Sequence, residues 1–210
     1  MLRELPMFRT IGLIGSIIGT AAGLASLINM FNMSTLTVGA YITEVGLWIL
    51  WFVLQGCAFL VIYRERNDNA ALAAFILAVI SALLEASTMM VLLSAPSLTE
   101  IAETLATMLQ LFFAILIGTF TEATYLIFSG VAALHMTRYG TKDSIAYGSG
   151  IILILTGCVI GLGLFIALSP LIPFFIIAAN IMACILFISP RSTEYQRVSA
   201  EESDSGLGLQ

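Results

Sequence analysis

The chain has 210 residues, of which 60% are apolar and only 10% are charged. A soluble domain usually carries about a quarter charged residues, so this composition excludes an ordinary water-soluble protein and predicts an integral membrane protein. No basic stripe is present, which excludes nucleic acid as a partner. The net charge of −5 implies no cationic partner, because several acids gather near the C-terminus: Glu194, Glu201, Glu202 and Asp204.

Six apolar runs are long enough to cross a bilayer. Backbone groups in hydrocarbon bond only within their own segment, so each run forms a helix, and its length excludes barrel strands. We therefore predict an all-α fold, a polytopic membrane helical bundle over residues 1–189, followed by a disordered cytoplasmic tail over 190–210. The predicted spans are 10–31, 45–63, 70–94, 108–135, 145–168 and 171–188.

The first span is longer than the apolar region of a usual signal peptide. We therefore expect it to be retained, with cleavage near Ala22 or Ala25 as the alternative.

Small residues recur along the first and fifth spans. Gly15, Gly19 and Gly23 follow one another at four-residue spacing, and Gly157 and Gly161 repeat the pattern. Such a face lets a second helix approach closely, which is how membrane helices gain packing contacts. The sequence leaves open whether the partner helix belongs to the same chain, to a second copy or to another membrane protein.

The basic residues indicate the orientation. With six spans, all eight Lys and Arg residues fall on one side of the bilayer, which the positive-inside rule makes cytoplasmic. We therefore expect a multi-pass protein of the cell membrane with both termini in the cytoplasm. Trp48 and Trp51 lie toward the outer end of the second span, where an aromatic belt forms. The basic residues are Arg3, Arg9, Arg64, Arg66, Arg138, Lys142, Arg191 and Arg197.

Strongly polar residues occur in the middle of four spans. They are Gln55, Glu85, Glu122 and Asn180, and Thr121 precedes the second glutamate. At a rise of 1.5 Å per residue, we expect these four to lie within about 5 Å of one plane. An acid at a helix centre costs about 2.5–3.5 kcal/mol on the insertion scale, and no cationic side chain lies at this depth.

Two interpretations of this polar layer remain open. Acids inside a membrane often carry protons or bind cations, which makes the layer a candidate site. Amides and hydroxyl groups also connect helices by hydrogen bonds, typically worth under about 1 kcal/mol each. In that case the layer only fixes the packing of the bundle.

The remaining reactive residue types predict no chemistry. His135 lies at the cytoplasmic end of the fourth span, and we expect it to be an interfacial polar residue rather than a haem or metal ligand. Cys57, Cys158 and Cys184 fall in apolar runs and are typical of small apolar filler residues. No nucleophile–base pair, metal cluster or phosphate loop occurs, so we expect no catalytic residue, metal or cofactor.

Three short segments carry a resemblance to a known family. They are Arg9 to Gly12, Asn67 to Leu72 before the span with Glu85, and Met136 to Gly140. In these segments the chain resembles a family of polytopic prokaryotic integral membrane proteins defined only as a domain of unknown function. The resemblance implies a bundle of six or seven helices and assigns no activity.

These patterns favour a non-enzymatic accessory or structural membrane component. The first alternative is a small proton- or cation-coupled transporter that uses Glu85 and Glu122, with three helices in each half of the chain. The second alternative, an intramembrane enzyme, ranks last because the sequence lacks the residue pairs that such chemistry requires.

Overall fold

The computed structural model describes residues 5–32, 37–94, 105–138, 144–163 and 171–188, and all of its regular structure is helical. This confirms the predicted all-α fold class. The predicted tail over 190–210 and the last part of the fifth predicted span, 164–168, lie outside the described residues. The helices are α1 (Leu5–Phe31), α2 (Val38–Arg66), α3 (Asn69–Ser94), α5 (Leu105–Arg138), α6 (Ser144–Gly163) and α7 (Ile172–Ile188).

Four of the helices are long and apolar enough to cross a membrane, which supports a membrane protein. Within the described residues, α6 and α7 provide shorter apolar stretches, Tyr147–Leu162 and Ile172–Ile185. The four long segments are Thr10–Phe31, Gly39–Arg64, Asn69–Met90 and Leu116–His135.

The second helix begins earlier than its apolar run predicts. Thr37 adopts an extended backbone conformation, and its hydroxyl oxygen accepts a hydrogen bond from the backbone N–H of Ala40 at 3.2 Å. This is a helix N-cap, and it starts the helix at Val38 rather than at residue 45. Glu44 is consequently inside α2, where its side chain can reach a neighbouring helix.

A tight turn joins α2 to α3. Asn67 adopts the left-handed conformation (φ 53°), and its N–H donates to the carbonyl oxygen of Tyr63 at 2.7 Å. Asparagine tolerates this conformation better than most residues, so it ends α2. The carboxylate of Asp68 then accepts a hydrogen bond from the N–H of Ala70 at 2.8 Å, which caps the start of α3.

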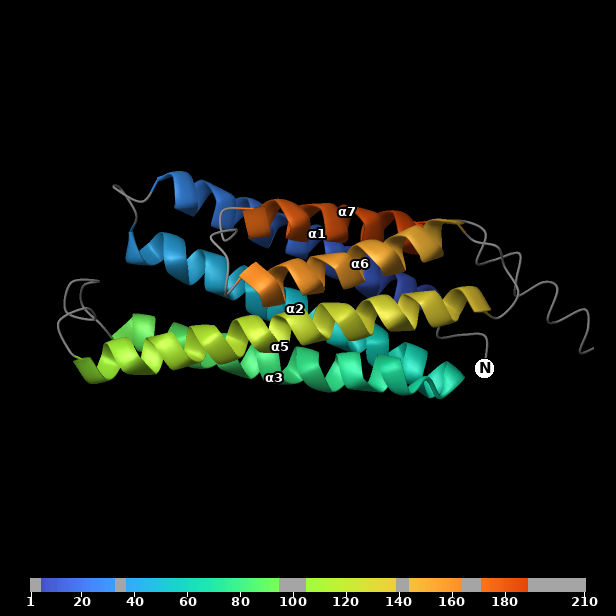
Figure 1. Cartoon of the computed structure of the whole chain (residues 1–210), viewed down its shortest axis with the longest axis horizontal. Helices are drawn as coiled ribbons and strands as arrows, with labels where there is room; N and C mark the ends of the chain where they lie inside the picture. The colour runs from blue at the N-terminus through green and yellow to red at the C-terminus, as the bar shows by residue number, and fades with distance from the viewer. Residues whose placement is uncertain (1–4, 33–36, 95–104, 139–143, 164–170, 189–210) are drawn as a thin grey trace, which may run out of the picture.

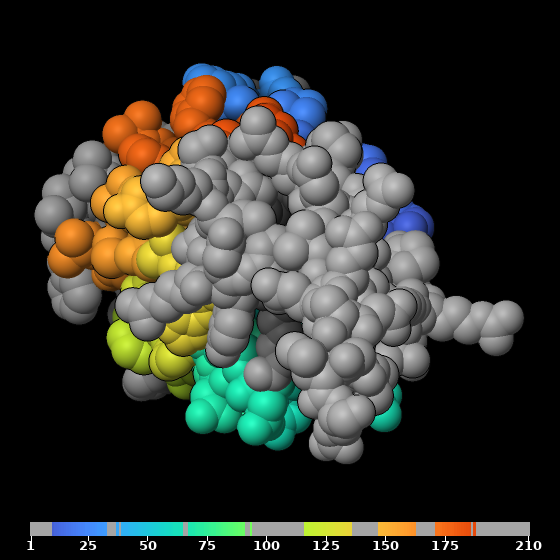
Figure 2. All heavy atoms as spheres, turned by 90° about the vertical axis from the view of Figure 1, so that its right-hand side faces the viewer, coloured from blue at the N-terminus to red at the C-terminus, as the bar shows by residue number. Residues whose placement is uncertain are grey.

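The six helices form a closed ring. Each helix packs against its neighbours in the order α1, α2, α3, α5, α6, α7, and α7 packs back against α1. Figure 1 shows the helices running along one axis, with α6 and α7 shorter than the other four. Figure 2 looks at one end of this bundle and shows α1 (blue), α7 (red-orange), α6 (orange) and α5 (yellow) one after another around its edge.

The glycine face of α1 packs inside this ring, against α2 and α7. Gly15 lies beside Gln55 of α2, because a Cβ atom at Gly15 would be 3.2 Å from the amide nitrogen of that side chain. Gly19 faces both Trp51 of α2 and Asn180 of α7, and leaves no room for a Cβ atom. These glycines therefore have partners within the chain, and contact with a second protein through the same face stays a prediction.

Glycine also brings α5 and α6 together. A Cβ atom at Gly157 would lie 2.5 Å from the carbonyl oxygen of Ala123, and one at Gly130 would lie 2.6 Å from that of Gly150. Both distances are too short for a real Cβ, so the two backbones are in close contact here. Gly161 is less tightly packed, because a Cβ atom built on it would lie 3.6 Å from the Cβ atom of Ala123.

Candidate functional site

Gln55 connects α2 to α1 in the interior of the ring. Its side chain is 4% exposed, and its amide nitrogen donates to the hydroxyl oxygen of Ser16 at 2.8 Å and to the carbonyl oxygen of Gly12 at 3.3 Å. Ser16 in turn donates to the same carbonyl at 2.9 Å. The sequence predicts Gln55 as a polar residue at mid-span, but no pattern in it indicates Ser16 as the partner.

Asn180 bonds to its own helix. Its amide nitrogen donates to the carbonyl oxygen of Ile176 at 3.0 Å, and the residue is buried. This bond leaves the amide oxygen on the other side of the side chain, next to Gly19 of α1. Asn180 thus contacts α1 without forming a hydrogen bond to another helix within the described residues.

The hydroxyl groups of the buried threonines also form hydrogen bonds within their own helices. The hydroxyl group of Thr121 donates to the carbonyl oxygen of Ile117 at 2.7 Å, and that of Thr156 donates to Ile152 at 2.7 Å. Both acceptors lie four residues earlier in the same helix. These hydroxyl groups therefore add no hydrogen bond between helices.

Glu85 and Glu122 lie on adjacent helices, α3 and α5, and their carboxyl groups are close enough to interact electrostatically. Both residues are half-buried. One carboxyl oxygen of Glu122 is buried and has no hydrogen-bond partner among the described residues. Glu85 also interacts electrostatically with Glu44 of α2. The electrostatic interaction between them indicates that the two acids are near each other across the contact of α3 with α5.

The strongly polar residues lie at similar depths along the bundle. Glu85 lies sixteen residues, or about 24 Å, from the beginning of α3 at the α2–α3 turn. Glu122 lies the same distance from the end of α5, which is at the same end of the bundle (Figure 1). Gln55 lies eleven residues, or about 17 Å, from the same end of the bundle. The acids between α3 and α5 are therefore about 7 Å from the level of Gln55 along the bundle, an offset that fits residues within about 5 Å of one plane.

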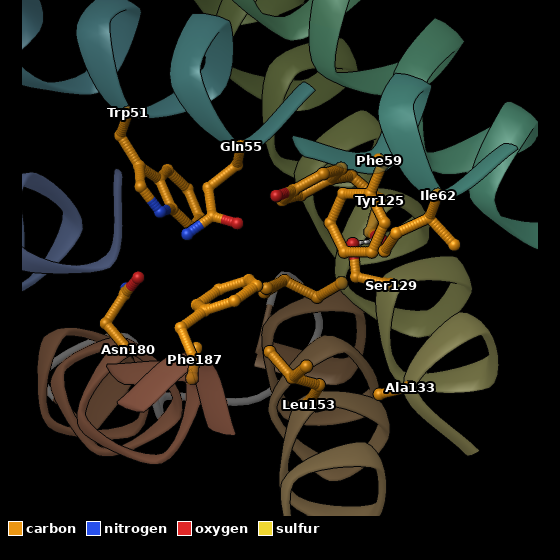
Figure 3. A pocket seen from close by; sticks show the side chains of 12 residues that line it. Trp51, Gln55, Phe59, Ile62, Tyr125, Ser129, Ala133, Leu153, Asn180 and Phe187 are labelled. Carbon is orange, nitrogen blue, oxygen red and sulfur yellow. Dashed lines mark hydrogen bonds between the residues drawn. The ribbon is translucent and has the colours of Figure 1, made fainter. Parts of the chain in front are cut away.

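A cavity occupies the interior of the ring beside Gln55 and Asn180. The space that water-sized molecules can enter measures about 30 Å³, which is room for two or three waters. Figure 3 shows the polar ends of Trp51, Gln55 and Asn180 pointing into this space, with Phe187 beside them. Neither Glu85 nor Glu122 lines the cavity, so it does not join the two groups of polar residues.

Trp51 has a different role from the one that the sequence suggests. It is 2% exposed, and its ring packs edge-on against Tyr125 of α5 at a centroid distance of 5.6 Å. It is therefore a core residue and not part of an aromatic belt. Trp48 lies in the half of α2 nearer Val38, where its indole N–H donates to the hydroxyl oxygen of Ser26 at 3.3 Å.

A polar network that the sequence patterns did not predict joins the C-terminal end of α1 to the N-terminal end of α2. The carboxylate of Glu44 accepts a hydrogen bond from the hydroxyl group of Ser26 and another from the amide of Asn29 at 2.6 Å. Ser26 and Asn29 are three residues apart and therefore share one face of α1. That spacing, opposite a lone acid, is the signal that could have predicted the contact.

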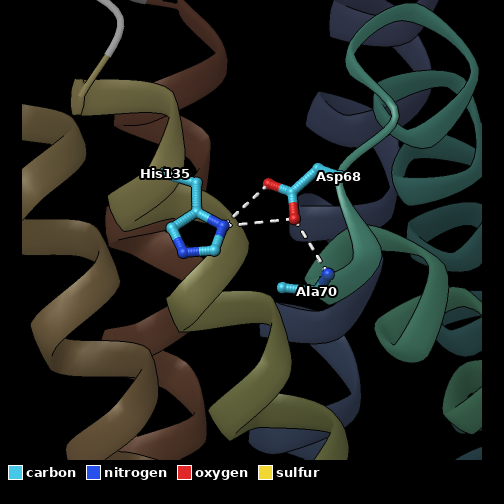
Figure 4. Close-up of polar contacts among 3 residues, drawn as sticks. All are labelled: Asp68, Ala70 and His135. Atoms are coloured by element: carbon cyan, nitrogen blue, oxygen red, sulfur yellow. Dashed lines mark hydrogen bonds and ion pairs between the residues drawn. The ribbon is translucent and has the colours of Figure 1, made fainter.

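His135 pairs with Asp68 at the end of the bundle near the α2–α3 turn. The imidazole Nδ1 lies 3.1 and 3.2 Å from the two carboxylate oxygens (Figure 4). Asp68 also caps α3, so the pair ties α5 to the beginning of that helix. The interfacial position of His135 stays a prediction, and the contact with Asp68 gives the residue a structural role.

The described part of the chain holds no group of three or more His, Cys, Asp or Glu side chains that could bind a metal ion. The remaining candidate sites are the contact of Gln55 with Ser16, the cavity beside Trp51, and the pair of Glu85 and Glu122. The chain matches no protein-family model, no curated protein and no solved structure.

Proposed function

We propose that this chain is a non-enzymatic accessory component of the cell membrane, in which the polar side chains of the interior fix the packing of the helices. The observation that carries the proposal is the double hydrogen bond from Gln55 to α1, through Ser16 and Gly12. Asn180 and the threonines satisfy their polar groups within their own helices and leave no buried donor that requires a ligand. The cavity beside Gln55 reaches neither glutamate.

We further propose that all six helices cross the membrane and that the end of the bundle with the α2–α3 turn is cytoplasmic. Arg9 is near the beginning of α1, Arg64 and Arg66 are at the end of α2, and Arg138 ends α5. Figure 1 places these helix ends together. The gathering of arginines supports this orientation by the positive-inside rule. Membership of the family of unknown function that the sequence resembles stays a prediction.

Cysteine labelling tests the orientation. In a chain with its three cysteines replaced by alanine, we expect an impermeant maleimide to label Thr37→Cys in intact cells. Asn69→Cys should be labelled only after permeabilisation, since it lies at the other end of the bundle. Both positions are exposed, and neither substitution removes an arginine. Labelling of Asn69→Cys in intact cells would contradict the proposed orientation.

A second candidate function is proton- or cation-coupled transport. The observation that favours it is a buried carboxyl oxygen of Glu122 that has no hydrogen-bond partner among the described residues. The carboxyl group of Glu85, on the neighbouring helix, interacts with Glu122 electrostatically. An acid in this position is costly inside a membrane and is often kept for a function. Glu44 extends the row of acids toward the outer end of the bundle.

Flux measurements in proteoliposomes separate the two candidates. If the protein is an accessory component, a pH gradient should drive no proton or sodium flux above that of empty liposomes. Glu85→Gln and Glu122→Gln should then leave thermal stability within about 1 kcal/mol of the parent, because glutamine keeps the shape and hydrogen-bonding capacity of a neutral acid. A pH-dependent flux that both variants abolish, while they remain folded, would instead establish the transporter.

A further inference from the structure

The carboxyl group of Glu122 has an oxygen that no described residue supplies with a hydrogen bond. This atom is buried, and it lies within the segment Leu116–His135, which is long and apolar enough to cross a membrane. The hydroxyl groups of Thr121 and Thr124, on either side along α5, donate to carbonyl oxygens of their own helix. A carboxylate can only accept hydrogen bonds, so the ionised form of Glu122 would leave a buried acceptor unsatisfied.

The neighbouring helices bring no positive charge to this carboxyl group. α3 and α6 pack against α5, and Glu85 is the only charged residue in α3, while α6 has none. Arg64 and Arg66 lie at the end of α2, about 20 Å or more along the bundle from the level of Glu122. Ser81 shares a face of α3 with Glu85, but its buried hydroxyl group has no partner among the described residues and therefore donates to neither acid. An ionised Glu122 would thus be a buried charge without compensation, which is strongly unfavourable.

Glu44 provides a contrast within the same chain. Its carboxylate accepts hydrogen bonds from the hydroxyl group of Ser26 and from the amide of Asn29, the latter at 2.6 Å. Donors of this kind stabilise the ionised form of a carboxyl group. Glu44 also lies only six residues, or about 9 Å, from the beginning of α2. The surroundings of Glu44 therefore suit a carboxylate, and those of Glu122 suit a neutral carboxylic acid.

We propose that Glu122 is a proton-binding site and holds its proton at neutral pH. The neutral form removes the uncompensated charge and gives the carboxyl group an O–H donor. Glu85, which interacts electrostatically with Glu122 and with Glu44, favours the proton on Glu122 because two neighbouring negative charges repel each other. The proposal goes beyond both candidate functions, since a proton that stays bound suits an accessory component and one that exchanges suits a transporter.

Infrared spectroscopy tests the proposal, because a protonated carboxyl group has a C=O stretching band that a carboxylate lacks. The measurement uses the full chain in nanodiscs of ether-linked lipids, which have no ester carbonyl group to overlap with this band. At neutral pH the parent chain should show the band. Glu122→Gln should remove it, and Glu44→Gln, the matched control, should leave its full intensity. No pH gradient is applied, so the result is independent of the flux measurement.

A double variant, Glu44→Gln with Glu85→Gln, provides a second test that does not require Glu122→Gln to fold. Glu122 is then the sole acid in the four segments that are long and apolar enough to cross a membrane, and the band should persist in full. Near-ultraviolet circular dichroism checks that each variant is folded. Absence of the band in the parent chain, its persistence in folded Glu122→Gln, or its loss from the folded double variant would overturn the proposal.

Discussion

Replacing Gly157 with alanine should lower the free energy of unfolding by about 1–3 kcal/mol, the usual cost of overpacking a tight contact. The new Cβ would lie 2.5 Å from the carbonyl oxygen of Ala123 and 3.1 Å from the backbone nitrogen of Ile127. These are backbone atoms, so α5 and α6 must move apart to admit the methyl group. Unfolding in mixed detergent and SDS micelles, followed by circular dichroism, measures the change.

Gly46→Ala is the matched control for this substitution. Gly46 also lies inside a long helix, but a Cβ there would meet no described atom within 4 Å. The control should therefore be neutral or more stable by up to about 1 kcal/mol, because alanine favours the helix over glycine. Gly130→Ala, at the same crossing as Gly157, should behave like Gly157→Ala. Equal stability of Gly157→Ala and Gly46→Ala would show that α5 and α6 are not in close contact.

Truncating Trp51 to alanine should destabilise the bundle by about 3 kcal/mol or more. The indole packs against Tyr125 and against Phe52, with a centroid distance of 4.7 Å to the second ring. Lipid is as apolar as the protein interior, so the loss comes mainly from packing contacts and the cavity left behind. Leu50→Ala is the control, because Leu50 is 51% exposed on the neighbouring position of α2 and should cost far less.

Trp51→Phe should cost much less than Trp51→Ala and remain within about 1 kcal/mol of the parent chain. Phenylalanine keeps an aromatic ring in the contact with Tyr125 and removes the buried N–H that has no partner in the described residues. Removing an unsatisfied donor offsets part of the lost packing. If Trp51→Phe were nearly as destabilising as Trp51→Ala, the indole N–H would have a partner in the folded protein. The same micelle unfolding experiment measures all three variants.

The sequence by itself determined the class of fold and the approximate limits of its helices. The predicted third span, 70–94, differs from α3 by one residue at its start, because a long apolar run in hydrocarbon can satisfy its backbone only as a helix. The four-residue spacing of Gly15, Gly19 and Gly23 likewise predicted a close helix contact, since that spacing places small residues on one face. These inferences need only local rules.

Only the tertiary structure decided which face of each helix points inward. Lipid and protein interior are equally apolar, so the apolar run around Trp51 does not reveal that this residue faces the ring while Leu50 is exposed. The same ambiguity in rotation hid the bond from Gln55 to Ser16. The partners of polar groups depend on how whole helices turn and cross, which no single segment of the chain specifies.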